Sequence, residues 1–88
     1  MNPEIEKEME RLAEAIAEVA EEVELATDED ATLQDIEGAK ALAADVLGKY
    51  DGFLKRLGPD DRREVQQMIG LKVEQLKGKM TRLKEAPE

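Results

Sequence analysis

The sequence lacks cysteine, histidine and tryptophan, and its two aromatic residues are Tyr50 and Phe53. Without cysteine there is no disulfide, no thiolate nucleophile and no cysteine-ligated metal, and without histidine there is no imidazole catalysis and little scope for zinc. No apolar run approaches the roughly 18 residues that cross a bilayer. The start, with Glu4, Glu6 and Glu8, does not have the basic-then-apolar order of a signal peptide. We therefore expect an intracellular, soluble, cytoplasmic protein without cofactor or metal.

The chain has 88 residues, of which 22 are acidic and 13 basic, giving a formal charge of −9. Charged residues make up 40% and hydrophobic residues 41% of the sequence, a composition typical of a soluble helical protein. The length suffices for one small hydrophobic core. We expect a single helical domain over residues 1–88.

Apolar periodicity predicts three helices, over about residues 3–26, 33–57 and 60–85. The first has apolar residues spaced alternately by four and three, the repeat of a coiled-coil seam: Ile5, Met9, Leu12, Ile16, Val19 and Val23. Alanines flank this seam and permit close approach of a neighbouring helix. Thr32 and Asp35 form a variant capping box, which predicts that the second helix starts at Leu33.

The second segment has the widest apolar face, so it is expected to be the central helix that touches both neighbours. Gly58 before Pro59 predicts a left-handed glycine that ends this helix and a tight reversal into the third. Two short connections favour an all-α, up-down-up three-helix bundle with coiled-coil-like packing. The first and third helices then run parallel.

Charge differs strongly between the predicted helices. Residues 3–26 hold nine glutamates and two bases, a net of −7, whereas residues 62–86 hold seven bases and three acids, a net of +4. Opposite charge favours placing these helices side by side, with Lys72 and Lys79 facing the glutamates of the first helix. Exposed ion pairs contribute only about 0 to 1 kcal/mol each, so charge selects the neighbour while apolar burial supplies stability.

No motif in the sequence predicts catalysis or metal binding. A calcium loop counted from Asp28 fails, because Leu33 stands where the turn glycine is required and Ala39 where the bidentate glutamate belongs. No carboxylate interrupts the centre of an apolar stripe, where burial could raise its pKa for acid–base work. We predict that the protein is not an enzyme.

A helical protein-interaction or assembly module is the function that the sequence favours. Met68 and Leu71 lie off the stripe of the third helix, and Leu42 and Phe53 lie at the edge of the broad face of the second. One interpretation makes these four residues, with Lys72 and Lys79 beside them, a groove between the second and third helices that binds a partner helix. Another interpretation places them in the chain's own core. Self-association through the heptad seam of the first helix is also open.

A charge-based regulator is the alternative function. Its acidic first helix would bind a basic partner, or its basic third helix would meet an anionic surface. A net charge of −9, with no glycine-rich phosphate loop and no aromatic platform, argues against nucleic-acid binding and against peripheral membrane contact. Salt separates the two functions, because screening weakens charge-led binding far more than apolar binding.

From Ala26 to Glu85 the layout resembles the microtubule interacting and transport domains. An acidic entry, Tyr50 in the middle helix and the lysine- and leucine-rich stretch from Leu71 to Lys84 are similar to that family. The resemblance implies a three-helix module that binds short helical peptides. The middle helix departs from the pattern, since that family is typically richer in tyrosine there, and the first helix has a strict heptad seam.

Overall fold

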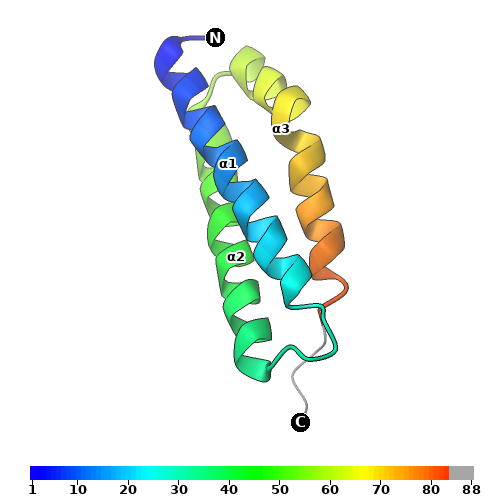
Figure 1. Cartoon of the computed structure of the whole chain (residues 1–88). Coiled ribbons are helices and arrows are strands. Elements are labelled where there is room, and N and C mark those ends of the chain that lie inside the picture. Colours follow the sequence, from blue (N-terminus) through cyan, green and yellow to red (C-terminus); the bar gives the residue numbers. More distant parts are fainter. Residues whose placement is uncertain (84–88) are drawn as a thin grey trace.

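Three helices account for most of the computed structural model, which describes residues 1–83 (Figure 1). Helix α1 spans Pro3–Leu25, α2 spans Leu33–Arg56 and α3 spans Pro59–Met80. They run up, down and up in an elongated bundle with principal extents of 46 × 20 × 17 Å, and α1 and α3 are parallel. The predicted all-α three-helix bundle is confirmed.

Each helix starts where local chemistry satisfies its free amides. The Asn2 side-chain oxygen accepts from the backbone N–H of Glu4 at 2.7 Å, and Pro3 occupies the first turn of α1. The predicted capping box of α2 is present, with Thr32 Oγ1 accepting from Asp35 N at 3.1 Å and the Asp35 carboxylate accepting from Thr32 N at 3.0 Å. These caps fix where α1 and α2 begin.

Two details of the predicted boundaries are wrong. Gly58 is not left-handed but extended, at φ −68° and ψ 168°, and it caps the start of α3 while Leu57 ends α2. Helix α3 ends at Met80 instead of continuing to about residue 85, and the chain then turns, with the Arg82 N–H donating to the Lys79 carbonyl and the Leu83 N–H to the Met80 carbonyl, each at 3.1 Å. Residues 84–85 of that prediction lie outside the described residues.

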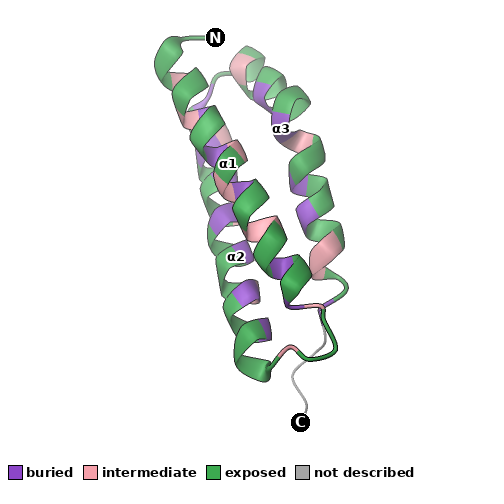
Figure 2. Cartoon of the chain, viewed as in Figure 1, coloured by how far each residue is buried: buried purple, intermediate pink, exposed green. Residues whose placement is uncertain are grey.

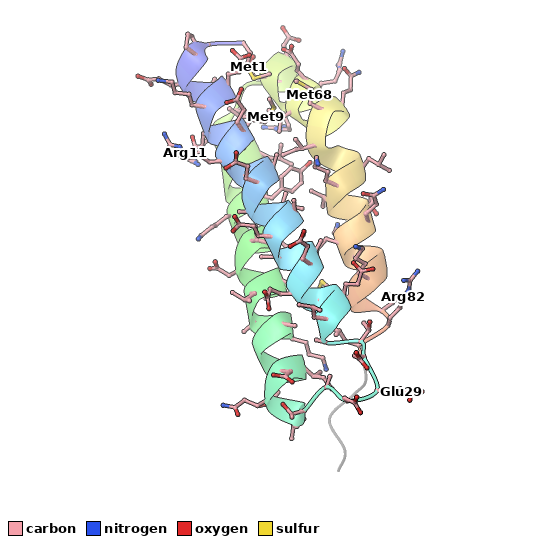
Figure 3. The ribbon with its side chains drawn as sticks, viewed as in Figure 1. Met1, Met9, Arg11, Glu29, Met68 and Arg82 are labelled. Carbon is pink, nitrogen blue, oxygen red and sulfur yellow. The ribbon has the colours of Figure 1, made fainter. Side chains whose placement is uncertain are left out.

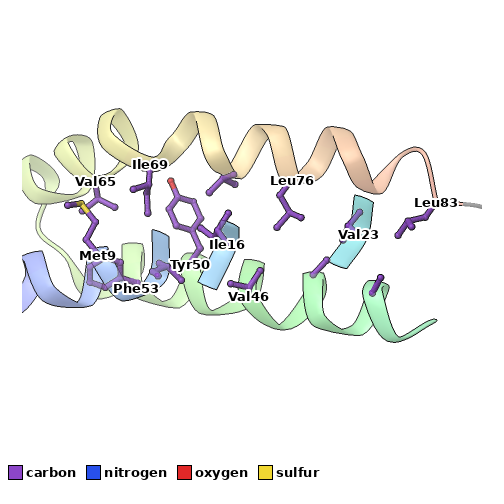
Figure 4. Close-up of a cluster of buried hydrophobic side chains, with 14 of the residues drawn as sticks. Met9, Ile16, Val23, Val46, Tyr50, Phe53, Val65, Ile69, Leu76 and Leu83 are labelled. Carbon is purple, nitrogen blue, oxygen red and sulfur yellow. The ribbon is translucent and has the colours of Figure 1, made fainter. Parts of the chain in front are cut away.

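The core runs the length of the bundle and contains side chains from all three helices (Figures 2 and 4). From α1 it takes most of the heptad seam, with Met9, Leu12, Ile16 and Val23 all buried. This seam is therefore covered by α2 and α3 of the same chain and is not free to pair with another copy. Just beyond the end of α3, Leu83 is buried in the core although it lies in a turn and not in a helix. Its spacing continues the apolar stripe of α3, which is why the sequence predicted a longer helix.

The central helix is α1, which corrects the expectation for the second segment. Helix α1 packs along both α2 and α3, whereas α2 and α3 touch each other less. Half-buried alanines on both flanks of α1, among them Ala13, Ala15 and Ala20, allow both neighbours to approach closely. In α2, the broad apolar face includes Tyr50, whose ring extends toward α3 and holds the two helices apart (Figure 4). The size of the side chains between the helices, and not the width of an apolar face, therefore determines which helix is central.

Candidate interaction surface

The structure does not bring together the four apolar residues that the sequence suggested as one groove. Phe53 is only 2% exposed and Leu42 is 45% exposed, and both line hollows between α1 and α2. Met68 is 56% and Leu71 71% exposed on α3. The hollow that does lie between α2 and α3 is lined by other residues: Tyr50, Asp51, Leu54, Gln66, Gly70, Val73, Glu74 and Lys77.

Met68 belongs to the α1 side of α3. At about 100° per residue it lies about 40° from Lys72 around the helix. Lys72 lines a shallow hollow between α1 and α3 together with Glu21. Figure 3 shows Met68 near the end of the bundle that contains the N-terminus. Their role in partner binding stays a prediction, but Met68 and Leu71 form a surface separate from Leu42 and Phe53.

The two predicted lysines do face α1. Lys79 Nζ lies 3.2 Å from the Glu24 carboxylate, which joins α3 to α1 as expected from their opposite charges. Lys72 shares the hollow between these helices with Glu21 and Ala17. The ion pair is largely exposed on its acidic side, so it contributes at most about 1 kcal/mol and mainly selects the neighbour.

A hollow of about 650 Å³, which we call the α1–α2 groove, lies between these helices near the N-terminal end of α1. Its floor is apolar and its rim is charged. The lining residues are Glu8, Arg11, Leu12, Ala15, Lys49, Gly52, Phe53 and Arg56. Leu12 and Phe53 belong to the buried core, so the floor of the groove is a rigid part of the fold.

Three cations surround this groove in a chain whose net charge is −9. Arg56 is held by an ion pair to Glu8 at 2.7 Å and its guanidinium lies 5.7 Å from the centre of the Phe53 ring. Lys49 pairs with Asp45 at 3.1 Å on its own helix. Figure 3 shows Arg11 projecting from the side of α1 away from α3. The rim therefore has three bases, of which Arg56 and Lys49 are held in ion pairs within the chain, and Glu8 lies among them.

Gly52 forms an open part of the groove wall. A β-carbon placed there would meet no atom within 4 Å, so nothing inside the chain requires a glycine at this position. Glycine within a helix costs about 1 kcal/mol relative to alanine. Its effect on the surface is to keep the groove open above Phe53 and Leu12, which are themselves only 2% and 8% exposed.

The same face carries exposed leucines at its opposite end, which we call the leucine end. Leu25 is 68% exposed and borders a smaller hollow with Ala26, Gly38 and Leu42. Glu22 and Asp35 are the charged residues of that lining. One long face formed by α1 and α2 thus has a basic hollow at one end and projecting leucines with acidic neighbours at the other.

Sequence reasoning missed Arg11, Gly52, Arg56 and Leu25 as surface residues of interest. Arg11 gave a usable signal, because it is one of only two bases among nine glutamates in the first segment. Gly52 gave another, as a helix-interior glycine without an internal reason. The pairing of Arg56 with Glu8 depends on α1 and α2 being antiparallel neighbours, which no local pattern reveals.

Among residues 1–83 there is no group of three or more acidic residues placed to hold a metal ion. None of the helices described is both long enough and apolar enough to span a membrane.

The fold and surface define a small helical domain whose distinctive features are surface grooves between packed helices. Residues 6–85 match the family described as "Embryogenesis-like protein helical domain", and the chain belongs to this family. This is a different family from the microtubule interacting and transport domains that the layout resembles.

A curated relative supports the same assignment. The chain is 31% identical over 86 residues to the "Embryogenesis-like protein" of Arabidopsis thaliana. The match covers 94% of this chain and 49% of the relative, so the chain spans about half the length of that protein. No solved structure matches the chain.

Proposed function

We propose that the three helices act as one noncatalytic protein-interaction domain, in which the α1–α2 groove receives apolar side chains of a helical partner. The observation that carries this proposal is the groove itself, with its rigid Leu12 and Phe53 floor and its open wall at Gly52. Helix-binding domains use grooves of this kind, in which a few apolar side chains of the partner anchor between two helices. The exposed basic rim favours a partner with acidic residues beside its anchors.

The charge-based alternative has less support. Lys79 pairs with Glu24, Lys77 with Glu74, and the Arg62 guanidinium donates to the carbonyls of Leu54 and Leu57. These bases of α3 are engaged within the chain, which reduces what the helix offers to an anionic surface.

The test is selection of amphipathic helical peptides from a displayed library against the full chain, followed by affinity measurements on variants. Gly52→Leu fills the groove from its open wall without disturbing an internal contact. We expect it to weaken the selected peptides at least tenfold, on the order of the loss of one buried leucine-sized contact. Leu71→Glu, on the outer side of α3, is the matched control and should leave affinity unchanged.

Peptides that bind wild type and Gly52→Leu equally would contradict a role for the groove. Loss of binding in Leu71→Glu with retained binding in Gly52→Leu would place the site on α3 instead. Helicity by circular dichroism confirms that each variant is folded.

A further inference from the structure

We infer that a second copy of this chain occupies the α1–α2 face, as a two-fold antiparallel dimer. This inference rests on the proposed function and names the partner for the same groove. It uses the outer flanks of α1 and α2, since the heptad seam of α1 is buried within each chain.

Shape is the first argument. The face is hollow at one end, above Leu12, Gly52 and Phe53, and has projecting leucines at the other, where Leu25 is 68% and Leu42 45% exposed. In a two-fold contact the same patch serves both copies, so each end of one copy meets the opposite end of the other when the copies are antiparallel. The leucine end of each copy then enters the hollow of the other copy, so the dimer contains this contact twice.

Register supports this pairing. On α2, Leu42 and Gly52 are equally distant from residue 47, and on α1, Arg11 and Glu22 are equally distant from the midpoint between residues 16 and 17. Residues 8–15 of α1 lie across one hollow from residues 49–56 of α2, and residues 22–26 lie across the other from residues 35–42, so these two midpoints lie at a similar level along the bundle. A single two-fold axis therefore places Leu42 opposite Gly52 and Arg11 opposite Glu22 at once.

Charge is the second, independent argument. The hollow end has three bases, Arg11, Lys49 and Arg56, and one acid, Glu8, on its rim, whereas the charged residues of the leucine end are Glu22 and Asp35. Antiparallel packing sets the basic rim of one copy against the acidic end of the other, whereas parallel packing would oppose like charges. Long-range repulsion between two chains of charge −9 is screened over about 8 Å at physiological ionic strength, so the local pairing decides the orientation.

The face is large enough for a stable contact. The bundle measures 46 Å along its axis and 20 Å across. A standard interface buries about 800 Å² per partner, which a face of these dimensions supplies. Gly38 and Gly52 have no side chains that would project from this face and obstruct a second copy. A β-carbon at either position would meet no atom of its own chain within 4 Å.

The experiment is molar mass by light scattering behind a sizing column, over a hundredfold range of concentration and at about 0.15 M salt. We expect the wild-type chain to change from monomer to dimer as concentration rises. Leu42→Glu and Gly52→Leu should each raise the dimer dissociation constant at least about tenfold, and the control Leu71→Glu should not change it.

Charge reversal tests the orientation. Arg11→Glu and Glu22→Arg should each weaken the homodimer, because each variant then opposes like charges at both pairs. The double variant Arg11→Glu with Glu22→Arg should restore it, since the pairs are opposite again in an antiparallel dimer. Both residues are exposed, so these changes leave the core intact.

A wild-type chain that stays monomeric at every concentration overturns the second copy as occupant. If that monomer still binds helical peptides through the groove, the proposed function stands and only this inference fails. A dimer that is insensitive to Leu42→Glu and Gly52→Leu also overturns it, because the contact then lies elsewhere.

Discussion

At the scale of single residues, Tyr50 reports on how tightly α2 and α3 are joined. Its ring is buried in the core while it borders the hollow between these two helices. Burial raises the pKa of Tyr50 above its ordinary value of about 10, and the nearby charges of Asp51 and Glu74 raise this pKa further. It is the one tyrosine in the chain, so its titration is observed without interference.

We therefore predict a pH dependence of stability that belongs to Tyr50. Because the folded-state pKa exceeds the unfolded value, folding favours the protonated phenol. This contribution is fully present below the unfolded pKa, near pH 10, and is lost as pH rises through the folded pKa. Absorbance of tyrosinate near 295 nm, compared between folded and urea-unfolded protein, measures the difference.

The control is Tyr50→Phe, which keeps the ring and removes the ionisable group. Its unfolding free energy should fall less steeply than that of wild type in the alkaline range. Equal tyrosinate titration curves for folded and unfolded protein would contradict the account.

At the scale of helices, the α2–α3 corner is held by a side chain from the following helix. Arg62 donates through Nε to the Leu54 carbonyl at 3.1 Å and through Nη2 to the Leu57 carbonyl at 3.0 Å. These carbonyls belong to the last turn of α2 and its C-cap, where the helix dipole favours a cation. One arginine thus joins the end of α2 to the start of α3.

We predict that Arg62→Ala lowers the free energy of unfolding by about 1 to 2 kcal/mol, since two charge-assisted hydrogen bonds to the helix end are lost. The neighbouring Arg63→Ala is the matched control and should change stability by less than about 0.5 kcal/mol. Urea denaturation followed by circular dichroism measures both. Equal losses for the two variants would show that the corner does not depend on this contact.

The outcome for each helix shows what the sequence could predict. The apolar stripes and the Thr32–Asp35 box predicted three helices, their order and the parallel placement of α1 and α3, because these follow from local periodicity, caps and charge. Periodicity did not show that α3 ends at Met80, since Leu83 keeps the helical spacing while it is buried from a turn. Width of an apolar face did not identify the central helix, because alanines on α1 determined the closest approach.

The candidate site was less predictable for a related reason. A helical wheel shows which residues leave the core stripe, but not which neighbouring helix they approach. Leu42 and Phe53 were predicted to lie together at the edge of the apolar face of α2, but only Leu42 is exposed, Phe53 is buried in the core, and both line hollows beside α1. The hollow above Phe53 also depends on the absent side chain of Gly52, which sequence analysis counted only as a cost to the helix.

At the scale of the whole molecule, one face of the bundle combines the features that a partner would recognise. The α1–α2 face has a hollow, projecting leucines and opposite charges at its two ends. Met68 and Leu71 of α3 are exposed apolar residues, but they line none of the hollows described above. This contrast favours the α1–α2 face as the surface that binds a partner.

The most direct measurement is a series of amide nitrogen–proton correlation spectra recorded over a hundredfold range of protein concentration. We expect concentration-dependent shifts on the α1–α2 face, with the amide signals of Arg11, Leu42 and Gly52 among the largest to move, and unchanged positions for Met68 and Leu71. Spectra that do not change, or changes centred on Met68 and Leu71, would contradict this expectation.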